Sequence, residues 1–344
     1  MKIGTVELGS PFAIAPMAGM TDTAFRRLVK RKGGCGLVVT EMVSSEGLIR
    51  GIDRTLEYAE YTEEERPISI QIFGGDPAKM AAAAQIVEGM GADIVDVNMG
   101  CPVPKIAKHN AGCSLMREPE QAAGVIAAMT KAVKIPVTVK MRAGWNDDER
   151  NAPTLAKMVE DAGAAAIAVH GRTAAQSYSG LADWDLVARI AADLTIPVFG
   201  SGDCIEPEQI VERVRTGAEG VLVGRGVLRN PWILAQAVDL AAGRTPHPVT
   251  PANRGEFLLE YIDLLLRERI DDERVVSHDR WVINKLRALG SYYTKGLDNG
   301  SHLRTAINTA DSLARLRETI ISFFSVRPDA AGAAGPPAAA AAAH

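Results

Sequence analysis

Short apolar runs alternate with longer helical patterns from residue 11 to about residue 243, and this alternation constrains the fold more than any other feature. Helical stretches such as DTAFRRLVKRKG and DPAKMAAAAQIVEGMG open on an acidic residue or an Asp-Pro pair and close on glycine, as helices do. Eight units of roughly 30 residues predict a closed (β/α)8 TIM barrel, because a doubly wound sheet would carry a glycine fingerprint after its first strand. The eight predicted strands are PFAIAPM, LVVTEMV, ISIQIF, IVDVNM, PVTVKMR, AIAVHGR, IPVFGSG and GVLVGRG.

The barrel is expected to span residues 1–243, with three further segments after it. A Pro-rich stretch predicts a linker at residues 244–252. Residues 253–326 carry helical patterns and predict a small helical domain. The Ala-, Pro- and Gly-rich tail at residues 327–344 offers no packable face, so we expect it to be disordered.

Composition indicates a soluble globular protein, since 47% of the 344 residues are hydrophobic and 23% are charged. The N-terminus lacks the apolar segment of a signal peptide, and no apolar run reaches the roughly 18 residues of a membrane helix. We therefore expect a cytoplasmic protein with no membrane partner. The four cysteines show no C-x-x-C spacing, which predicts reduced thiols and no metal site. We further expect a monomer.

The C-terminal ends of the strands form the active face of a TIM barrel. In this chain those positions are rich in polar side chains and glycine. In strand order they are Pro16, Met17 and Ala18; Gln71; Asn98, Gly100 and Cys101; Lys140 and Arg142; His170 and Arg172; Ser201, Gly202 and Asp203; Gly224 and Arg225.

Strands seven and eight end in the glycine-containing loops GSGD and GRG. Glycine lets backbone N–H groups approach an anionic oxygen closely, and these two loops are the usual phosphate position of the barrel. Either loop alone is explained by the glycine that any turn needs. The pair on neighbouring strands favours a phosphorylated cofactor or substrate.

Lys140 ends an otherwise apolar strand, where an ammonium without an anionic partner would be costly. A reduced flavin is anionic near its nitrogen 1 and would meet this need, with hydrogen bonds added by Gln71 and His170. The alternative is an internal salt bridge to Asp96 or Glu41. His170 by itself is also compatible with a structural histidine.

Five stretches together resemble the tRNA-dihydrouridine synthases, and the details are most similar to the bacterial B-type branch. They are APMAGMTD, VDVNMGCPVPK, VTVKMRAGW, VHGRTAAQSYSG, and GSGD with LVGRG, in the family's order along the whole barrel. The N-M-G-C-P motif followed by K-x-R and H-G-R-T is highly specific. The resemblance implies an FMN-dependent enzyme that reduces a uridine in tRNA, with NADPH or NADH as the reductant.

The resemblance also implies roles for individual residues. Cys101 would be the general acid, because a thiol with an ordinary pKa near 8.5 is still protonated at neutral pH and can deliver a proton to carbon 5 of uracil. A small buried hydrophobe is the alternative reading of Cys101. Asn98, Arg142, Arg172 and Lys105 would bind the substrate. FMN would be contacted by Pro16, Met17, Ala18, Gln71, Lys140, His170, Ser201, Gly202, Asp203, Gly224 and Arg225.

The chain departs from the family pattern at a few positions. Ser201 stands where asparagine is common, and Cys113 stands where a serine is usual. Tyr292 replaces a tryptophan in the helical domain. These departures put the side-chain contribution of Ser201 in question and leave Cys113 without an expected role.

A uridine stacked in folded tRNA must be extruded to reach a barrel mouth, and backbone contacts from cations would have to offset that cost. The net charge of −4 restricts such contacts to local patches. Candidate cations are Arg26, Arg27, Lys30, Arg31 and Lys32 in one helix, and Arg280, Lys285, Arg287, Lys295 and Arg304 beside Tyr292 and Tyr293 in the helical domain.

Two other functions fit the same residues. One is an FMN-dependent dehydrogenase that acts on a free pyrimidine, which would not need the C-terminal helical domain. The other is a non-catalytic RNA-binding regulator built on the same barrel, which the combination of Cys101, Lys140 and His170 makes less favourable.

Overall fold

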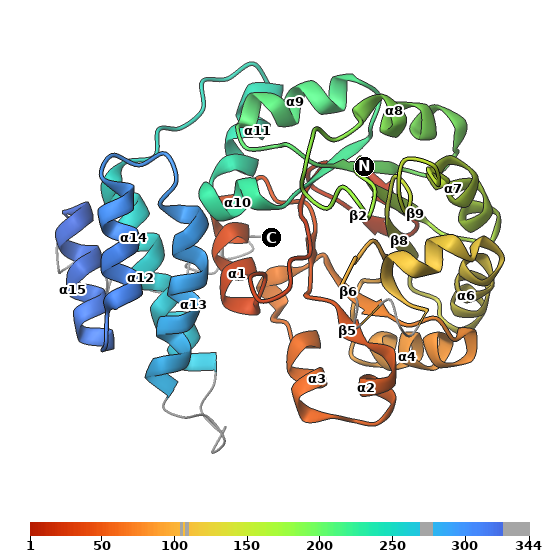
Figure 1. Ribbon diagram of the computed structural model, residues 1–344, viewed down its shortest axis with the longest axis horizontal. Helices are drawn as coiled ribbons and strands as arrows, with labels where there is room; N and C mark the ends of the chain where they lie inside the picture. Colours follow the sequence, from red (N-terminus) through yellow and green to blue (C-terminus); the bar gives the residue numbers. More distant parts are fainter. Residues whose placement is uncertain (104–105, 107–109, 269–277, 326–344) are drawn as a thin grey trace, which may run out of the picture. The chain divides into compact units, whose positions relative to one another are not determined.

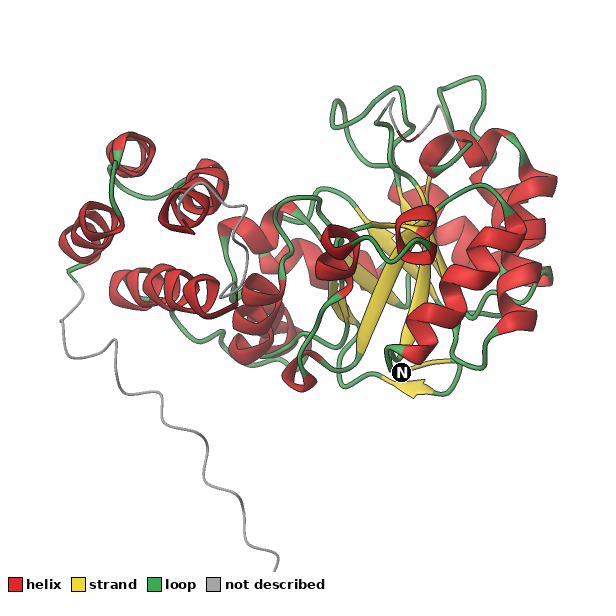
Figure 2. Ribbon diagram, turned by 90° about the horizontal axis from the view of Figure 1, so that it is seen from below, coloured by secondary structure: helices red, strands yellow, loops and turns green. Residues whose placement is uncertain are grey.

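The structure is a computed structural model that describes residues 1–103, 106, 110–268 and 278–325. The chain forms two compact units, one spanning Met1–His247 and the other beginning at Pro248. The first unit is the predicted TIM barrel: its parallel strands run in the order β3-β11-β10-β9-β8-β7-β6-β4, with helices outside them (Figures 1 and 2). A parallel bridge between Ala13 and Leu37 closes the ring, which confirms the fold class.

The strands lie where the apolar runs predict them, with one difference. The second run is divided into two short strands that both pair with β6, because the Thr40 hydroxyl accepts the hydrogen bond of the Gln71 N–H (3.1 Å) that a backbone carbonyl would take in a regular ladder. The strands are β3 (Phe12–Ile14), β4 (Val38–Val39), β5 (Val43–Ser44), β6 (Ile68–Phe73), β7 (Ile94–Met99), β8 (Val137–Arg142), β9 (Ala166–His170), β10 (Val198–Ser201) and β11 (Gly220–Val223).

Helices occupy the stretches between the barrel strands where the sequence predicts them, and three of them begin at an aspartate N-cap. Asp22, Asp76 and Asp183 each accept a hydrogen bond from the backbone N–H three residues later. The helices are α1 (Thr23–Lys32), α4 (Pro77–Gly89), α6 (Pro119–Ala132), α7 (Ala152–Asp161), α8 (Trp184–Asp193) and α9 (Pro207–Arg215). Short elements that the sequence analysis did not predict are α2 (Ser45–Ile49), α3 (Asp53–Ala59), η1 (Glu63–Glu65), η2 (Gly112–Arg117), α10 (Arg225–Arg229) and α11 (Ile233–Ala241).

Apolar side chains fill the barrel interior near the N-terminal ends of the strands. A hairpin of β1 (Lys2–Ile3) and β2 (Val6–Glu7) closes the end at which the strands begin, where Figure 2 marks the N-terminus. Its Ile3 and the nearby Leu8 join a core that includes Ala13, Ala15, Leu37, Val39, Ile94, Ala166, Ala168, Phe199 and Leu222. Because strand side chains alternate, the next inward positions along the same strands hold the polar residues of the site.

The second unit contains four helices within its described residues. They are α12 (Pro251–Glu268), α13 (His278–Tyr293), α14 (Gly300–Thr309) and α15 (Leu313–Phe324). The C-terminal part of the predicted helical domain contains two helices, α14 and α15, because the Ser312 hydroxyl caps a new helix by accepting the Arg315 N–H (3.3 Å). The tail predicted at residues 327–344 lies outside the described residues.

Candidate active site

A cleft at the C-terminal ends of the strands collects most of the residues predicted to hold a cofactor. It encloses about 560 Å³, part of which is open solvent. Two predicted residues do not line the cleft: Ala18 is exposed in the loop after β3, and Gln71 is buried in β6 beside Asp96 of β7. The predicted residues that do line it are Pro16, Met17, Lys140, His170, Ser201, Gly202, Asp203, Gly224 and Arg225.

Lys140 faces this cleft from the end of β8. Burial lowers the pKa of its ammonium to about 8, and nearby Arg142 acts in the same direction while Asp96 opposes it. The alternative of an internal salt bridge is wrong. Within the described part of the chain no carboxylate lies within 4 Å of the Lys140 Nζ; Asp96 and Glu41 accept hydrogen bonds from other donors. The cation therefore faces the cleft without a direct salt bridge to the described part of the protein.

His170, at the end of β9, is neutral. Burial and the surrounding cations, beginning with Lys140, lower the pKa of the imidazole to about 2. The Arg172 Nη1 lies 3.4 Å from the His170 Nε2, and a guanidinium can only donate. The Nε2 atom is then the acceptor and Nδ1 carries the proton.

Two glycines at the ends of β10 and β11 have different reasons to lack a side chain. Gly202 has φ +125°, and a Cβ there would lie 2.5 Å from the Ala182 Cβ. At Gly224 a Cβ would meet only the Met17 Sδ at 3.5 Å and the Ala15 Cβ at 3.8 Å, so it would occupy space of the cleft itself. Gly224 is also the N-cap of the short helix α10, whose first backbone N–H groups have no acceptor within the helix.

Arg172 and Asp203 join the loops after β9 and β10. The Arg172 Nη2 donates to the Asp203 Oδ1 (2.6 Å) and to the Gly180 carbonyl (2.7 Å). Burial alone would raise the pKa of the Asp203 carboxyl, but hydrogen bonds from the Ala182 N–H and from Arg172 hold it below its ordinary value. Arg172 is only 2% exposed, and its guanidinium is occupied by these protein groups.

A chain of side-chain hydrogen bonds crosses three neighbouring strands below the cleft. Thr138 Oγ1 and Gln71 Nε2 donate to the two carboxylate oxygens of Asp96, at 2.6 and 2.7 Å. The Gln71 Oε1 accepts from the Asn98 Nδ2 (2.8 Å), and the Asn98 Oδ1 accepts from the backbone N–H groups of Gly100 (3.2 Å) and Cys101 (2.9 Å). Asn98 therefore holds the start of the cysteine loop.

Cys101 follows β7 and is partly exposed. Burial raises the pKa of its thiol, although Arg142 and Lys140 act in the opposite direction. Cys113 is fully buried, donates its backbone N–H to the Cys101 carbonyl (3.0 Å), and has a thiol pKa raised to about 11 by burial. Cys113 thus packs behind the loop that carries Cys101.

Arg142 connects three loops of the active face. Its Nε donates to the Gly100 carbonyl (2.7 Å), and its Nη1 donates to the carbonyls of Thr173 and Ser177 (both 3.0 Å). Among the described residues, its Nη2 has no hydrogen-bond partner. One arm of this guanidinium is therefore available to a ligand.

Tyr178 belongs to the site although the sequence analysis did not select it. Its side chain is 60% exposed, lines the cleft, and lies under two guanidinium groups, those of Arg225 at 4.9 Å and Arg142 at 6.0 Å from the ring centroid. The one available signal was an aromatic residue inside the polar, glycine-flanked loop QSYSG.

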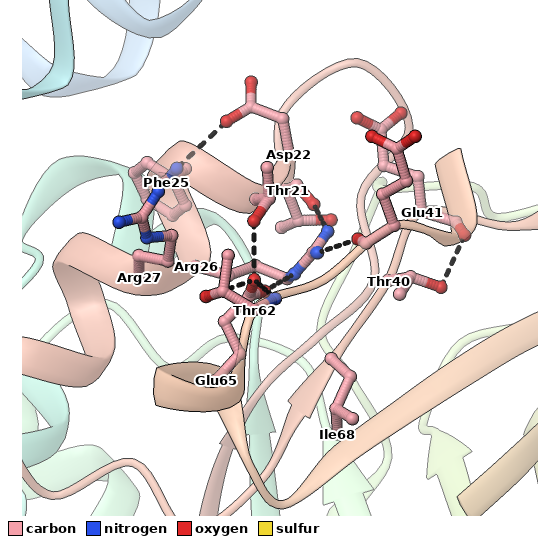
Figure 3. A network of polar contacts seen from close by, with 12 residues as sticks. Thr21, Asp22, Phe25, Arg26, Arg27, Thr40, Glu41, Thr62, Glu65 and Ile68 are labelled. Atoms are coloured by element: carbon pink, nitrogen blue, oxygen red, sulfur yellow. Dashed lines mark hydrogen bonds and ion pairs between the residues drawn. The ribbon is translucent and has the colours of Figure 1, made fainter. Parts of the chain in front are cut away.

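The cations predicted in helix α1 are largely engaged with the protein. Arg26 is 2% exposed and forms a buried ion pair with Glu65 (Figure 3), so its prediction as an RNA contact is wrong. Arg27 and Arg31 both pair with Glu64. Lys30 donates to the Cys35 carbonyl (3.1 Å), and Lys32 lies 5.6 Å from the ring centroid of Trp232.

In the second unit, Tyr293 is unavailable for stacking on RNA. It is fully buried, stacks on Phe257 with ring centroids 5.8 Å apart, and donates its hydroxyl to the Arg254 carbonyl (2.9 Å). Of the remaining candidates, Arg280 and Arg304 are exposed, and Lys295 lies 5.4 Å from the ring centroid of Tyr292. Arg287 is half-buried and donates to the Ala310 carbonyl (3.0 Å), and the half-buried Lys285 lies 5.7 Å from the ring centroid of Trp281.

Three further expectations concern absences and undescribed positions. Lys105, predicted to bind substrate, lies outside the described residues. Across the ranges that the structure describes, no group of three or more His, Cys, Asp or Glu side chains is arranged to hold a metal ion. None of the helices in those ranges has the length and apolar character needed to cross a membrane.

Comparison with known proteins gives consistent matches. The family described as "Dihydrouridine synthase (Dus)" matches residues 13–319. A probable tRNA-dihydrouridine synthase of Rickettsia conorii is 38% identical over 332 residues, covering 94% of this chain and 96% of that protein. The tRNA-dihydrouridine synthase B of Xanthomonas axonopodis pv. citri is 41% identical over 267 residues, covering 77% of this chain and 80% of that protein. Histamine dehydrogenase from Rhizobium sp. 4-9 matches with a TM-score of 0.55 at 14% identity, over 77% of this chain and 50% of that chain, a likeness of fold alone.

Proposed function

Because the chain belongs to the dihydrouridine synthase family, we propose that it reduces a uridine of tRNA to 5,6-dihydrouridine, with FMN as its cofactor and NADPH or NADH as the reductant. The observation that carries this proposal is the strand-end cleft, which is lined by the Lys140 ammonium and lies beside strand β7, whose end leads into Cys101.

The residues of the cleft fit FMN. Lys140 presents a cation with no acceptor among the described residues, and the Ser201 hydroxyl is likewise without a hydrogen-bond partner there. Gly224 leaves space that a side chain would fill, beside the start of helix α10. Lys140 would hold an anionic ring edge, and Ser201, Gly224 and Arg225 would hold the phosphate-bearing tail. When bound, FMN supplies a hydride donor for carbon 6 of uracil.

Cys101 would supply the proton for carbon 5. Its raised pKa keeps the thiol protonated at neutral pH, which is the form that a general acid requires. The Asn98 side chain fixes the backbone at Cys101 and so limits where the sulfur can lie. Since both acceptor and donor of Asn98 already have partners, we assign it a positioning role, with one remaining N–H available to the base.

Arg142 would stabilise the negative charge that develops on the uracil oxygen. Its Nε and Nη1 are fixed by three backbone carbonyls, which leaves Nη2 as a donor that is already oriented before the substrate arrives. Arg172 would act indirectly, because its own donors are occupied by Asp203 and the loop after β9. The exposed ring of Tyr178 would offer a stacking surface for an extruded base.

The experiment that tests the proposal is mass spectrometry of tRNA from cells with and without the protein. One dihydrouridine position, two daltons heavier than uridine, should disappear on deletion and return with the wild-type protein. Cys101→Ala should not restore it, whereas Cys113→Ser should. A tRNA that keeps every dihydrouridine after deletion would instead favour a free pyrimidine as substrate, and restoration by Cys101→Ala would contradict the acid role.

A non-catalytic RNA-binding regulator remains the second alternative. It would bind tRNA with or without FMN, and its preparation would not be bleached by NADPH. Purified protein that is yellow and loses its absorbance under NADPH would exclude that function.

A further inference from the structure

A buried ion pair behind the cleft bears on how the cleft keeps its shape. We propose that Arg26 and Glu65 are positioning residues that set the conformation of the Pro16–Asp22 loop, and thereby the affinity for the flavin, without touching it (Figure 3). The flavin part of this inference rests on the proposed function. The conformational part stands on the hydrogen bonds alone.

Arg26 uses all three nitrogens of its guanidinium inside the protein. Its Nε donates to the Glu65 Oε2 (2.5 Å), its Nη1 to the Thr21 carbonyl (2.8 Å), and its Nη2 to the Glu60 carbonyl (2.8 Å). A planar guanidinium held at three points can adopt only one orientation. The Thr21 carbonyl is therefore fixed relative to the segment Glu60–Glu65.

Glu65 is equally constrained. Its side chain is fully buried, and its second oxygen accepts from the Thr23 hydroxyl (2.5 Å) and from the Thr62 N–H (2.8 Å). A buried charge pair is stable only when its remaining hydrogen-bonding capacity is satisfied, as it is here. The carboxylate thus ties the start of α1 to the segment before β6.

Hydrogen bonds within the Pro16–Asp22 loop connect Thr21 to Met17. The Thr21 hydroxyl lies within hydrogen-bond distance of both the Met17 N–H (3.1 Å) and the Met17 carbonyl (3.3 Å). The N–H groups of Met20 and Thr21 also donate to that carbonyl, at 3.0 and 3.1 Å. Met17 lines the cleft, so the sequence of contacts runs from Glu65 through Arg26 and Thr21 to the cofactor side.

A neighbouring ion pair provides a matched control. Arg27 follows Arg26 in sequence and Glu64 precedes Glu65; they also pair with each other, but their side chains are 19% and 34% exposed. Within the described residues, Glu64 accepts hydrogen bonds only from Arg27 and Arg31 and forms none with the Pro16–Asp22 loop. Glu64→Gln therefore removes a charge from the same short helix, η1, without removing a hydrogen bond to the loop.

The test compares Glu65→Gln with Glu64→Gln in the full-length protein. We expect Glu65→Gln to weaken FMN binding about tenfold or more, because charged hydrogen bonds are lost, and Glu64→Gln to change it less than about twofold. The dissociation constant follows from quenching of FMN fluorescence. In the FMN-free protein, hydrogen exchange at the Met20 and Thr21 amides should be faster in Glu65→Gln than in Glu64→Gln.

Thr21→Val keeps the inference testable if Glu65→Gln does not fold. It preserves shape and leaves the ion pair intact but removes the hydroxyl that holds Met17, and it should weaken FMN binding to a similar extent. Unchanged exchange at Met20 and Thr21 in Glu65→Gln, or unchanged FMN affinity in Thr21→Val, would overturn the inference. Wild-type protein that binds no FMN would refute the proposed function, while the exchange comparison would still decide the role of the ion pair.

Discussion

The unpaired cation of Lys140 leads to a prediction about stability. Burial holds the pKa of its ammonium at about 8, against 10.5 for an exposed lysine. A residue that favours a ligand at the expense of the unliganded fold should be replaceable with a gain in stability. We therefore expect Lys140→Met, which keeps the length of the side chain and removes the charge, to stabilise the FMN-free protein at neutral pH while weakening FMN binding.

The magnitude follows from the two pKa values. The unfolded chain binds a proton at Lys140 up to about pH 10.5, whereas the folded chain binds it only up to about pH 8. Lys140 therefore lowers the free energy of unfolding, fully below about pH 8 and progressively less up to about pH 10.5. At 1.36 kcal/mol for each pKa unit, that penalty is about 3 kcal/mol at pH 7 and falls to less than about 1 kcal/mol near pH 10.5. The stability advantage of Lys140→Met over the wild type should therefore shrink as the pH rises through this range.

Urea unfolding of the FMN-free wild type and Lys140→Met at pH 7 and at pH 10 measures this difference. Burial of the methionine side chain contributes equally at pH 7 and at pH 10. The change in the stability difference between variant and wild type from pH 7 to pH 10 therefore reports the effect of the lysine charge alone. A variant that is no more stable than the wild type at pH 7, or a stability difference that does not shrink toward pH 10, would refute the reasoning.

Three other predictions concern the site and the proposed tRNA substrate. Because the folded protein holds His170 neutral with a pKa of about 2 while the unfolded chain takes up a proton below about 6.5, stability should fall as the pH drops below 6.5, by about 2 kcal/mol at pH 5. His170→Gln should remove that part of the slope in urea unfolding at pH 7 and pH 5, and an equally steep slope in the variant would contradict the assignment. Tyr178→Ala should raise KM for tRNA more than it changes the rate of FMN reduction by NADPH, as measured by stopped flow, because its ring is proposed to contact the base; equal effects on both would argue against stacking. Affinity for tRNA, measured by filter binding, should fall as salt rises from 50 to 200 mM by about tenfold or more, since the predicted contacts are to phosphates, and an affinity indifferent to salt would count against them.

The period of the sequence predicted the barrel well, because parallel strands buried on both faces leave a strong apolar signal between helical caps. The division of the second strand at Thr40 left no such signal, since it depends on a side-chain hydroxyl that replaces a backbone acceptor on the neighbouring strand. Divisions of this kind arise from tertiary contacts and are not visible in local propensity.

The site shows a similar contrast. Strand ends converge on one face of a barrel, so residues as distant as Met17 and Arg225 were predicted to meet and do line one cleft. The partners of each group were harder to predict. In its sequence context Arg26 resembles a surface cation, yet it is buried and paired with Glu65, 39 residues away. Tyr178 was missed because an aromatic residue in a loop has no periodicity to mark its exposure.

The link between Arg172 and Asp203 has a consequence for how this enzyme can diverge or be redesigned. The segment from Thr173 to Ala182 receives its anchors from an arginine at its own start and from a carboxylate on the next βα loop. Because both contacts are to backbone atoms of the segment, a segment of equal length and backbone path from a relative should be accepted as long as Arg172 and Asp203 are kept. The side chains of this segment are therefore free to vary, whereas a change at Arg172 or Asp203 would release both ends of the tether at once.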